Sequence, residues 1–256
     1  MEIISWNIDW SYNSKSEDPD RIIKNEEKVI IAKDILETFE PKPDILSLLE
    51  AGISKSPDIK GYKKICLDRK YMYDGYKNGI VVYVKNDYEV EVCQEVLKEI
   101  KDNVIACFFS VKIQKGKLSF NCLFVWVTTK TKQEQNEAYG YKRFNGILNS
   151  GKFKKTLEFI NGNINDVIVI GDFNLVSNHK DDLEKQRKWE QIKGDFEKLG
   201  LQWVENYKNT FYSVTNDHCF LSKILIEKSV LSVRNNKVNK TVSDHNIINI
   251  KIKSSL

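Results

Sequence analysis

The sequence predicts a single α/β domain spanning residues 1–256, in which one sheet packs on another and helices lie outside. Two features of the chain lead to this fold class. Strand-helix-strand passages near the start are followed by hairpin-like runs in the middle, a mixture that disfavours a doubly wound parallel sheet. The 256 residues also contain 41% hydrophobic side chains, with no repeat and no glycine- or proline-rich linker. One sizeable core is therefore expected.

The first half of the chain opens on a strand, followed by a helix. The segment 2–9 predicts the opening strand, buried almost from its first residue. The segment 19–39 predicts a helix, because Asp18 precedes Pro19 and apolar residues then recur at helical spacing. A second strand is expected over 44–49.

Strand-like runs dominate the middle of the chain, at 79–84, 104–113 and 118–127. The tight turn 114–117 joins the last two and predicts a β-hairpin. The remaining expected elements are a helix over 142–161, a strand over 166–170, a helix over 182–199 and short strands from Gln202 onward.

Cysteine usage and the length of the apolar runs indicate the compartment. The five cysteines are widely spaced and never form a Cys-x-x-Cys pair, which favours buried free thiols over a zinc site or a disulfide framework. The longest apolar runs are strand-sized, and no basic segment followed by an apolar one opens the chain. We expect a cytoplasmic protein that does not bind membranes, and a monomer.

The charge distribution suggests one polyanion-binding edge. The whole chain carries a formal net charge of only +4, whereas the segment 128–156 holds seven basic and two acidic residues with aromatic residues between them. Such a segment is typical of a surface that binds nucleic acid. The alternative is that these residues form the solvated face of a helix.

Four short segments place polar or acidic residues at the ends of apolar strands, where a rigid sheet can make side chains converge. Carboxylate and amide oxygens are the ligands that hard divalent cations prefer. The candidate magnesium ligands are Asn7, Glu50, Asp172, Asn174 and Asp244, with His245 beside them as a donor to a phosphate oxygen. Taken singly, each segment is more often a turn, a helix cap or an exposed loop. Taken together, they would require several coincidences.

The same segments form an ordered set of motifs: Trp6-Asn7-Ile8, a Glu50 that ends a Pro-Asp-Ile-Leu strand, Gly171-Asp172-Phe173-Asn174 and Ser243-Asp244-His245. This set resembles the endonuclease/exonuclease/phosphatase superfamily, which includes exonuclease III, the apurinic endonucleases, DNase I and inositol polyphosphate 5-phosphatases. The resemblance covers nearly the whole chain and is closest to the exonuclease III and apurinic endonuclease branch. It implies a four-layered α/β-sandwich with two mixed, mostly antiparallel sheets packed face to face, the DNase I-like fold.

The resemblance also implies a magnesium site. Glu50 would be the principal Mg²⁺ ligand, with Asn7 beside it and Asp9 as a further candidate. Asp244 would add a second carboxylate at the metal. Mn²⁺ accepts the same oxygen ligands and would serve as an alternative cofactor.

Four residues acquire catalytic roles from the resemblance. Asp172 would orient and deprotonate the attacking water, and Asn174 would hold that water or a phosphate oxygen. His245 would stabilise the phosphate in the transition state. The run 216–222 matches a late strand of the family that begins with a carboxylate, so Asp217 is expected to orient His245 and to favour its cationic form.

One departure from the family concerns the strand around residue 126. The family has a His or a Tyr there, whereas this chain has Trp126, whose indole cannot exchange a proton as those side chains can. We predict that Trp126 and Lys130 contact the substrate, with Thr128 or Thr129 as other candidates for the missing phosphate contact. The alternative is that Trp126 packs in the core.

These features together predict a Mg²⁺-dependent phosphodiesterase that hydrolyses nucleic acid by in-line attack of water. DNA is favoured over RNA on branch resemblance alone. The main alternative is a phosphomonoesterase or small-molecule phosphodiesterase that acts on a nucleotide or a phosphorylated head group. A third interpretation is a degenerate, non-enzymatic member that binds nucleic acid or a partner protein without cleaving it.

Overall fold

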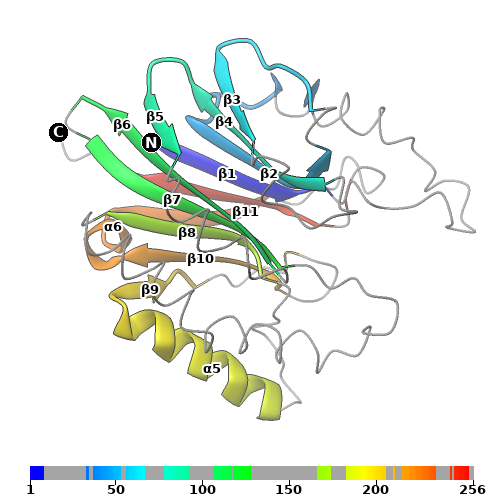
Figure 1. Cartoon of the computed structure of the whole chain (residues 1–256). Helices are drawn as coiled ribbons and strands as arrows, with labels where there is room; N and C mark the ends of the chain where they lie inside the picture. The colour runs from blue at the N-terminus through cyan, green and yellow to red at the C-terminus, as the bar shows by residue number, and fades with distance from the viewer. Residues whose placement is uncertain are drawn as a thin grey trace, which may run out of the picture.

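The structure is a computed structural model that describes residues 1–8, 33–34, 37–52, 56–66, 78–92, 106–116, 118–127, 166–173, 183–205, 210, 215–234, 243 and 245–253. Its framework is two six-stranded sheets packed face to face (Figure 1). Among these residues, no helix is both long and apolar enough to cross a membrane.

Each sheet combines one parallel pair of strands with antiparallel neighbours. The first sheet has the order β11 (Ser229–Arg234), β12 (Ile247–Ile252), β1 (Glu2–Asn7), β2 (Ile45–Gly52), β4 (Asn78–Lys85) and β3 (Tyr62–Cys66). The second has the order β5 (Glu89–Val92), β6 (Ala106–Lys115), β7 (Leu118–Val127), β8 (Val167–Asp172), β10 (Asp217–Ser222) and β9 (Leu201–Trp203). The parallel pairs are β1–β2 and β7–β8. Parallel neighbours require long crossover connections, whereas the hairpin β6–β7 turns within a few residues.

The main core lies between the two sheets. Alternate residues of the central strands face it, because successive side chains of a strand point to opposite sides of the sheet. Strand β7 contributes Phe120, Cys122, Phe124 and Trp126, and β8 contributes Ile168 and Ile170. The first sheet closes this core with residues such as Ile80, Val82 and Val84 of β4. All of these side chains are buried.

An aromatic cluster holds helix α5 (Leu183–Lys198) against the outer face of the second sheet. The rings of Phe196 and Phe220 stack with centroids 3.9 Å apart. Trp189 packs on His218 with centroids 4.3 Å apart and meets Trp203 edge to face at 5.2 Å. Figure 1 shows α5 running alongside β9 at this edge of the sandwich. The helix is therefore anchored by aromatic side chains of β9 and β10.

The structure confirms the predicted fold class and most of the predicted strands. The hairpin strand 118–127 has the predicted bounds, and the helix predicted over 182–199 is α5. Three elements were not predicted from the sequence: β3, β5 and the short helix α6 (Lys223–Ile226). Both missed strands lie at sheet edges, where short, half-solvated strands carry little of the apolar pattern that reveals central ones. The helix predicted over 142–161 lies outside the described residues, as does most of the helix predicted over 19–39, of which residues 33, 34 and 37 are helical.

Candidate active site

The candidate site lies at one end of the sandwich, where the two sheets meet. Asp172 is the last residue of β8 and continues the core-facing row of Ile168 and Ile170. Asp217 is the first residue of β10 and is paired directly with Asp172 in the antiparallel ladder. On the other side of β8, Trp126 pairs with Asp172. Three adjacent strands thus place three side chains in one row at the end of the core.

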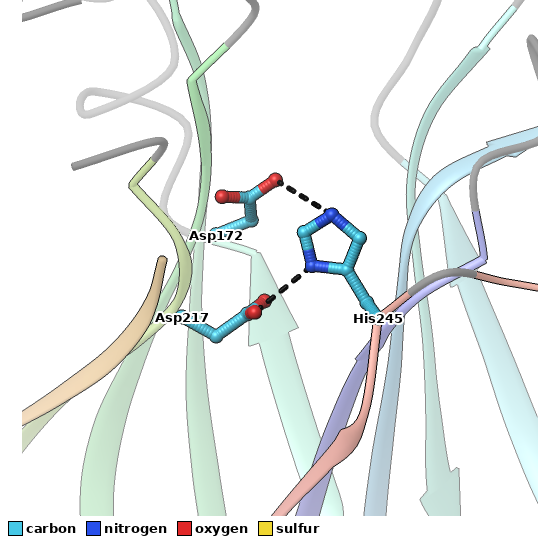
Figure 2. Close-up of side chains that lie close together, drawn as sticks. All are labelled: Asp172, Asp217 and His245. Carbon is cyan, nitrogen blue, oxygen red and sulfur yellow. Dashed lines mark hydrogen bonds and ion pairs between the residues drawn. The ribbon is translucent and has the colours of Figure 1, made fainter. Parts of the chain in front are cut away.

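His245 approaches these two aspartates from the first sheet, immediately before β12. Figure 2 shows its ring lying between the two carboxylates. Its Nδ1 is 2.9 Å from an oxygen of Asp217, and its Nε2 is 3.9 Å from an oxygen of Asp172. A carboxylate oxygen accepts hydrogen bonds. Nδ1 therefore carries a proton and donates a hydrogen bond to Asp217. The distance from Nε2 to Asp172 is too long for a hydrogen bond, but it is within the range of an ion pair when the imidazole is protonated.

A hydrogen bond between Asn7 and Asp172 connects the two sheets at the site. The amide Nδ2 of Asn7, at the end of β1, donates to Oδ2 of Asp172 over 2.8 Å. Both side chains are buried, with exposed fractions of 1% and 0%. Because the amide nitrogen is turned toward Asp172, the carbonyl oxygen of the same amide is turned away from that carboxylate. This orientation suits an amide oxygen that is a candidate cation ligand.

Two side chains hold the backbone of His245: that of Trp6, which lies in β1, and that of Ser243, which is hydrogen-bonded to the end of β1. The hydroxyl of Ser243 accepts a hydrogen bond from the His245 amide at 3.0 Å and donates one to the Asn7 carbonyl at 2.5 Å. The indole of Trp6 donates to the His245 carbonyl at 3.2 Å. Ser243 and Trp6 belong to the motifs found in the sequence, but these backbone contacts were not predicted. They join two segments more than 230 residues apart in the chain.

Glu50 occupies a β-bulge at the end of β2. The register between β2 and β4 shifts between Leu48 and Ala51, so that two residues of β2 oppose one of β4. Glu50 has a φ of 54°, in the left-handed region that non-glycine residues rarely adopt. Leu48 and Ala51 both belong to a second apolar cluster of the first sheet, which also contains Trp6, Val81 and Tyr83. With strict alternation Glu50 would follow Leu48 on the same face, so the extra residue removes Glu50 from a position in that cluster. Strain of this kind concentrates at functional sites, and bulges redirect side chains there.

Gly171 allows β7 and β8 to approach closely just before Asp172. Its φ is 149°, and a Cβ atom built on it would lie 2.0 Å from the carbonyl oxygen of Val125. No other residue fits here without moving one of the two strands. The glycine of the Gly-Asp-Phe-Asn motif is therefore required by the packing that positions the aspartate.

Three of the predicted cation ligands are described: Glu50 and Asp172 have buried carboxylates and Asn7 has a buried amide, which are ligand types that Mg²⁺ and Mn²⁺ prefer. Asn7 contacts Asp172, and Glu50 follows Leu49, the partner of Asn7 in the parallel pair β1–β2. One potential ligand atom from each of Asp172, Asp217 and His245 also lies within 4.8 Å of the others. However, the hydrogen bond between Asp217 and His245 engages two of these groups with each other. That pair is better suited to holding and donating a proton than to binding a metal.

Several predicted site residues lie outside the described part of the chain: Asp9, Asn174, Asp244 and Lys130 with the rest of the basic segment 128–156. Trp126 is described and has an exposed fraction of 3% within the inter-sheet core. The packing alternative is thus realised, while the contact of Trp126 with substrate stays a prediction. His218 faces the aromatic cluster, where its ring lies 5.6 Å from that of Phe173.

Solved structures with the same fold cover almost the whole chain. The catalytic domain of Xenopus laevis APE2 matches with a TM-score of 0.64 and 14% identity, over 99% of this chain and 92% of that one. The endonuclease domain of TRAS1, a telomere-specific non-LTR retrotransposon, has a TM-score of 0.59 and 15% identity over 98% and 97%. A mannosyl-6-phosphatase of Bacteroides thetaiotaomicron has a TM-score of 0.60 and 14% identity over 99% and 100%.

No protein-family model and no curated protein matches the sequence. The two sheets and these structural matches show that the chain has the DNase I-like fold of the endonuclease/exonuclease/phosphatase superfamily. The resemblance drawn from the motifs is thereby confirmed at the level of the fold. Proteins with this fold include both an endonuclease and a sugar phosphatase, so the fold leaves the substrate open.

Proposed function

We propose that this protein is a phosphodiesterase that hydrolyses nucleic acid, DNA in preference to RNA, with the help of Mg²⁺ or Mn²⁺. The observation that carries this proposal is the buried arrangement of Asp172, His245 and Asp217 at the junction of the two sheets. One carboxylate fixes the imidazole through Nδ1, and the other lies 3.9 Å from Nε2. This arrangement suits the movement of a proton and the stabilisation of a charged phosphate.

Each residue of the site has a separate catalytic role in this proposal. Asp172, held by the Asn7 amide, accepts the proton of a water molecule aligned for attack on phosphorus. His245 presents Nε2 to a phosphate oxygen as negative charge builds in the transition state. Asp217 holds the imidazole in this orientation. Asn174 is proposed to hold the water or a phosphate oxygen.

Glu50 and Asn7 would hold the cation, with Asp244 as the further predicted ligand. When bound, a divalent cation neutralises charge on the scissile phosphate and on the leaving oxygen. The positive φ of Glu50 supports this assignment, because a buried carboxylate in a strained conformation is costly unless it serves a purpose at the site.

The preference for nucleic acid rests on two features of the sequence. The basic segment 128–156 would follow a phosphate backbone, and the motifs resemble those of the exonuclease III branch. The TRAS1 structure, an endonuclease domain, supports the capacity of the fold for this activity. Trp126 and Lys130 are the proposed contacts to the substrate.

The second candidate is a phosphomonoesterase, favoured by the match to a mannosyl-6-phosphatase over the full length of both chains. It would use the same residues on a small substrate. The two proposals differ in their dependence on salt, since binding a long polyanion releases many counterions and weakens steeply as salt rises.

We further propose that the protein is a cytoplasmic monomer. The described cysteines Cys66, Cys122 and Cys219 carry free thiols, and the last two are buried in the core. Free thiols are usual in a reducing compartment.

The test compares cleavage by wild type, Asp172→Asn and Asp166→Asn. The first substitution removes the charge while keeping an oxygen that can accept from Asn7. The second makes the same chemical change next to the opposite end of β8 and is the matched control. Substrates would be labelled single-stranded DNA, duplex DNA, abasic duplex, RNA and a generic phosphomonoester, each with and without Mg²⁺.

Magnesium-dependent cleavage of a polynucleotide that is lost in Asp172→Asn and with EDTA, but kept in Asp166→Asn, would support the nuclease proposal. Turnover of the monoester alone, with weak dependence on salt, would replace it with the phosphatase. Inactivity on every substrate together with retained binding of nucleic acid would favour the non-enzymatic interpretation.

A further inference from the structure

Thr210 is a fully buried residue between β9 and β10 that belongs to none of the sequence motifs. Its hydroxyl oxygen accepts two backbone hydrogen bonds, from the amides of Asn216 and Asp217, each at 3.0 Å. Its own carbonyl oxygen accepts a third, from the amide of Asn246, at 2.6 Å. One threonine thus contacts both the start of β10 and the segment that precedes β12.

These two segments carry the two members of the Asp217–His245 pair. Asp217 opens β10 in the second sheet, and Asn246 directly follows His245 and precedes β12 in the first sheet. The side chain of Thr210 holds one segment, and its main chain holds the other. Because Thr210 alone makes both sets of hydrogen bonds, a shift at the start of β10 is transmitted to the segment before β12 through the few covalent bonds of this residue.

We propose that Thr210 is a positioning residue that sets the distance between the Asp217 carboxylate and the His245 imidazole. The proposal rests on the proposed function, in which this pair orients the imidazole toward phosphate. A hydrogen bond of 2.9 Å between two buried groups tolerates little displacement, so the backbone on both sides must be held. Thr210 holds the backbone on both sides through hydrogen bonds to the amide of Asp217 and to that of Asn246, the residue after His245.

The simpler alternative is that Thr210 only satisfies two buried amides at the start of a strand. Such amides need an acceptor wherever they occur, and a side-chain hydroxyl often provides it. The two interpretations predict different effects of removing the hydroxyl. A structural cap would lower stability alone, whereas a positioning residue would also alter the Asp217–His245 hydrogen bond.

The main variant is Thr210→Val, which keeps the branched shape and burial but removes the acceptor of both amides. Thr210→Ser keeps the hydroxyl and should restore the wild-type behaviour. Ser222→Ala is the matched control. The Ser222 hydroxyl also accepts a hydrogen bond from a backbone amide, that of Val167 in β8, but it lies at the end of β10 that is far from Asp217. It should lower the melting temperature without affecting the site.

The first measurement is the proton NMR spectrum of the protein without metal or substrate. The Nδ1 proton of a histidine hydrogen-bonded to a carboxylate is strongly deshielded, and its absence in Asp217→Asn assigns it. We expect this signal to shift upfield or disappear in Thr210→Val and to remain in Thr210→Ser and Ser222→Ala. An unchanged signal in a folded Thr210→Val would overturn the proposal. If that variant does not fold, Thr210→Cys serves the same test, because sulfur is a weak acceptor.

The second measurement is turnover of whichever substrate the wild type cleaves. In Thr210→Val, kcat should fall about 10²-fold, the scale expected for a displacement of about 1 Å at a reacting group, with KM nearly unchanged. In an Asp217→Asn background the same substitution should add less than about threefold, because both changes act through one pair. A full 10²-fold loss in that background would show that Thr210 acts elsewhere. If the wild type cleaves nothing, the proposed function fails, and the NMR signal still decides the role of Thr210.

Discussion

Replacing Gly171 with alanine should damage both the fold and the site. The added Cβ would lie 2.0 Å from the carbonyl oxygen of Val125, about 1 Å closer than real Cβ atoms approach. The neighbour is the backbone of β7, paired with Gly171 in the middle of the second sheet, so it cannot swing aside as a side chain could. One of the two strands must therefore move, and Asp172 is the next residue along β8.

The expected loss of stability has two contributions. Holding a non-glycine residue in a sparsely populated backbone region costs about 1–3 kcal/mol. Forcing extra atoms into a packed interior typically costs about 1–3 kcal/mol as well. The midpoint of their sum is about 4 kcal/mol, which corresponds to a drop in melting temperature of about 8–16 °C for a chain near this size.

Thermal unfolding followed by circular dichroism would measure this loss, with Gly194→Ala as the matched control. Gly194 lies within helix α5, and a Cβ atom there would meet nothing within 4 Å. Alanine in a helix interior is favoured over glycine by about 0.5–1 kcal/mol, so the control should melt slightly higher than wild type. A melting temperature of Gly171→Ala within about 2 °C of wild type would refute the steric argument. In the folded fraction, kcat should fall about 10²-fold because Asp172 is displaced.

Three further predictions concern the site, the aromatic cluster and the core thiols. Asp217→Asn should lower kcat by about 10²-fold or more with little change in melting temperature, because an amide no longer fixes the tautomer and orientation of the His245 imidazole. Steady-state kinetics would measure this loss, and a loss below about threefold would argue against the pairing. Trp189→Ala should destabilise the protein by about 3–5 kcal/mol in urea titration, since it removes a buried side chain of α5 that packs on β9 and β10; a cost under about 1 kcal/mol would contradict that packing. Burial raises the pKa of the thiols of Cys122 and Cys219 above the usual 9.0, so at about pH 8 both should resist iodoacetamide in the native protein and react only after unfolding, as peptide mass spectrometry can show. Above pH 9.0 the unfolded thiols ionise before the folded ones, so these two groups make stability fall as pH rises.

The choice between a long and a small substrate depends on the basic segment 128–156, which follows the strand of Trp126 in the sequence and is proposed to bind a phosphate backbone. Neutralising two of its lysines, with Lys152→Gln and Lys154→Gln, would test that placement. A nuclease that follows the phosphate backbone with this segment should lose affinity on duplex DNA and show a shallower dependence on salt. A phosphatase acting on a small substrate should be unaffected.

The apolar pattern of the sequence determined the central strands and the chemistry at their ends. Core strands such as β7 and β8 are visible because burial of one or both faces leaves a periodic or continuous apolar run. The motif residues Asn7, Asp172 and His245 are visible because polar side chains border those runs. The motifs also resemble those of a superfamily, and the fold expected from that resemblance is present.

Tertiary structure alone decided how these residues meet. The bond from Asn7 to Asp172 spans 165 positions, and Thr210 joins the strand of Asp217 to the segment of His245. Such contacts depend on strand register and on how two sheets pack, and neither is encoded in a local pattern. The bulge at Glu50 is likewise not predictable from the sequence. A positive φ is usually signalled by a glycine or another turn residue, whereas here it occurs at a glutamate, where β2 has one extra residue opposite β4. Local pattern thus names the side chains at the ends of the strands, and packing of the two sheets brings them together into one site.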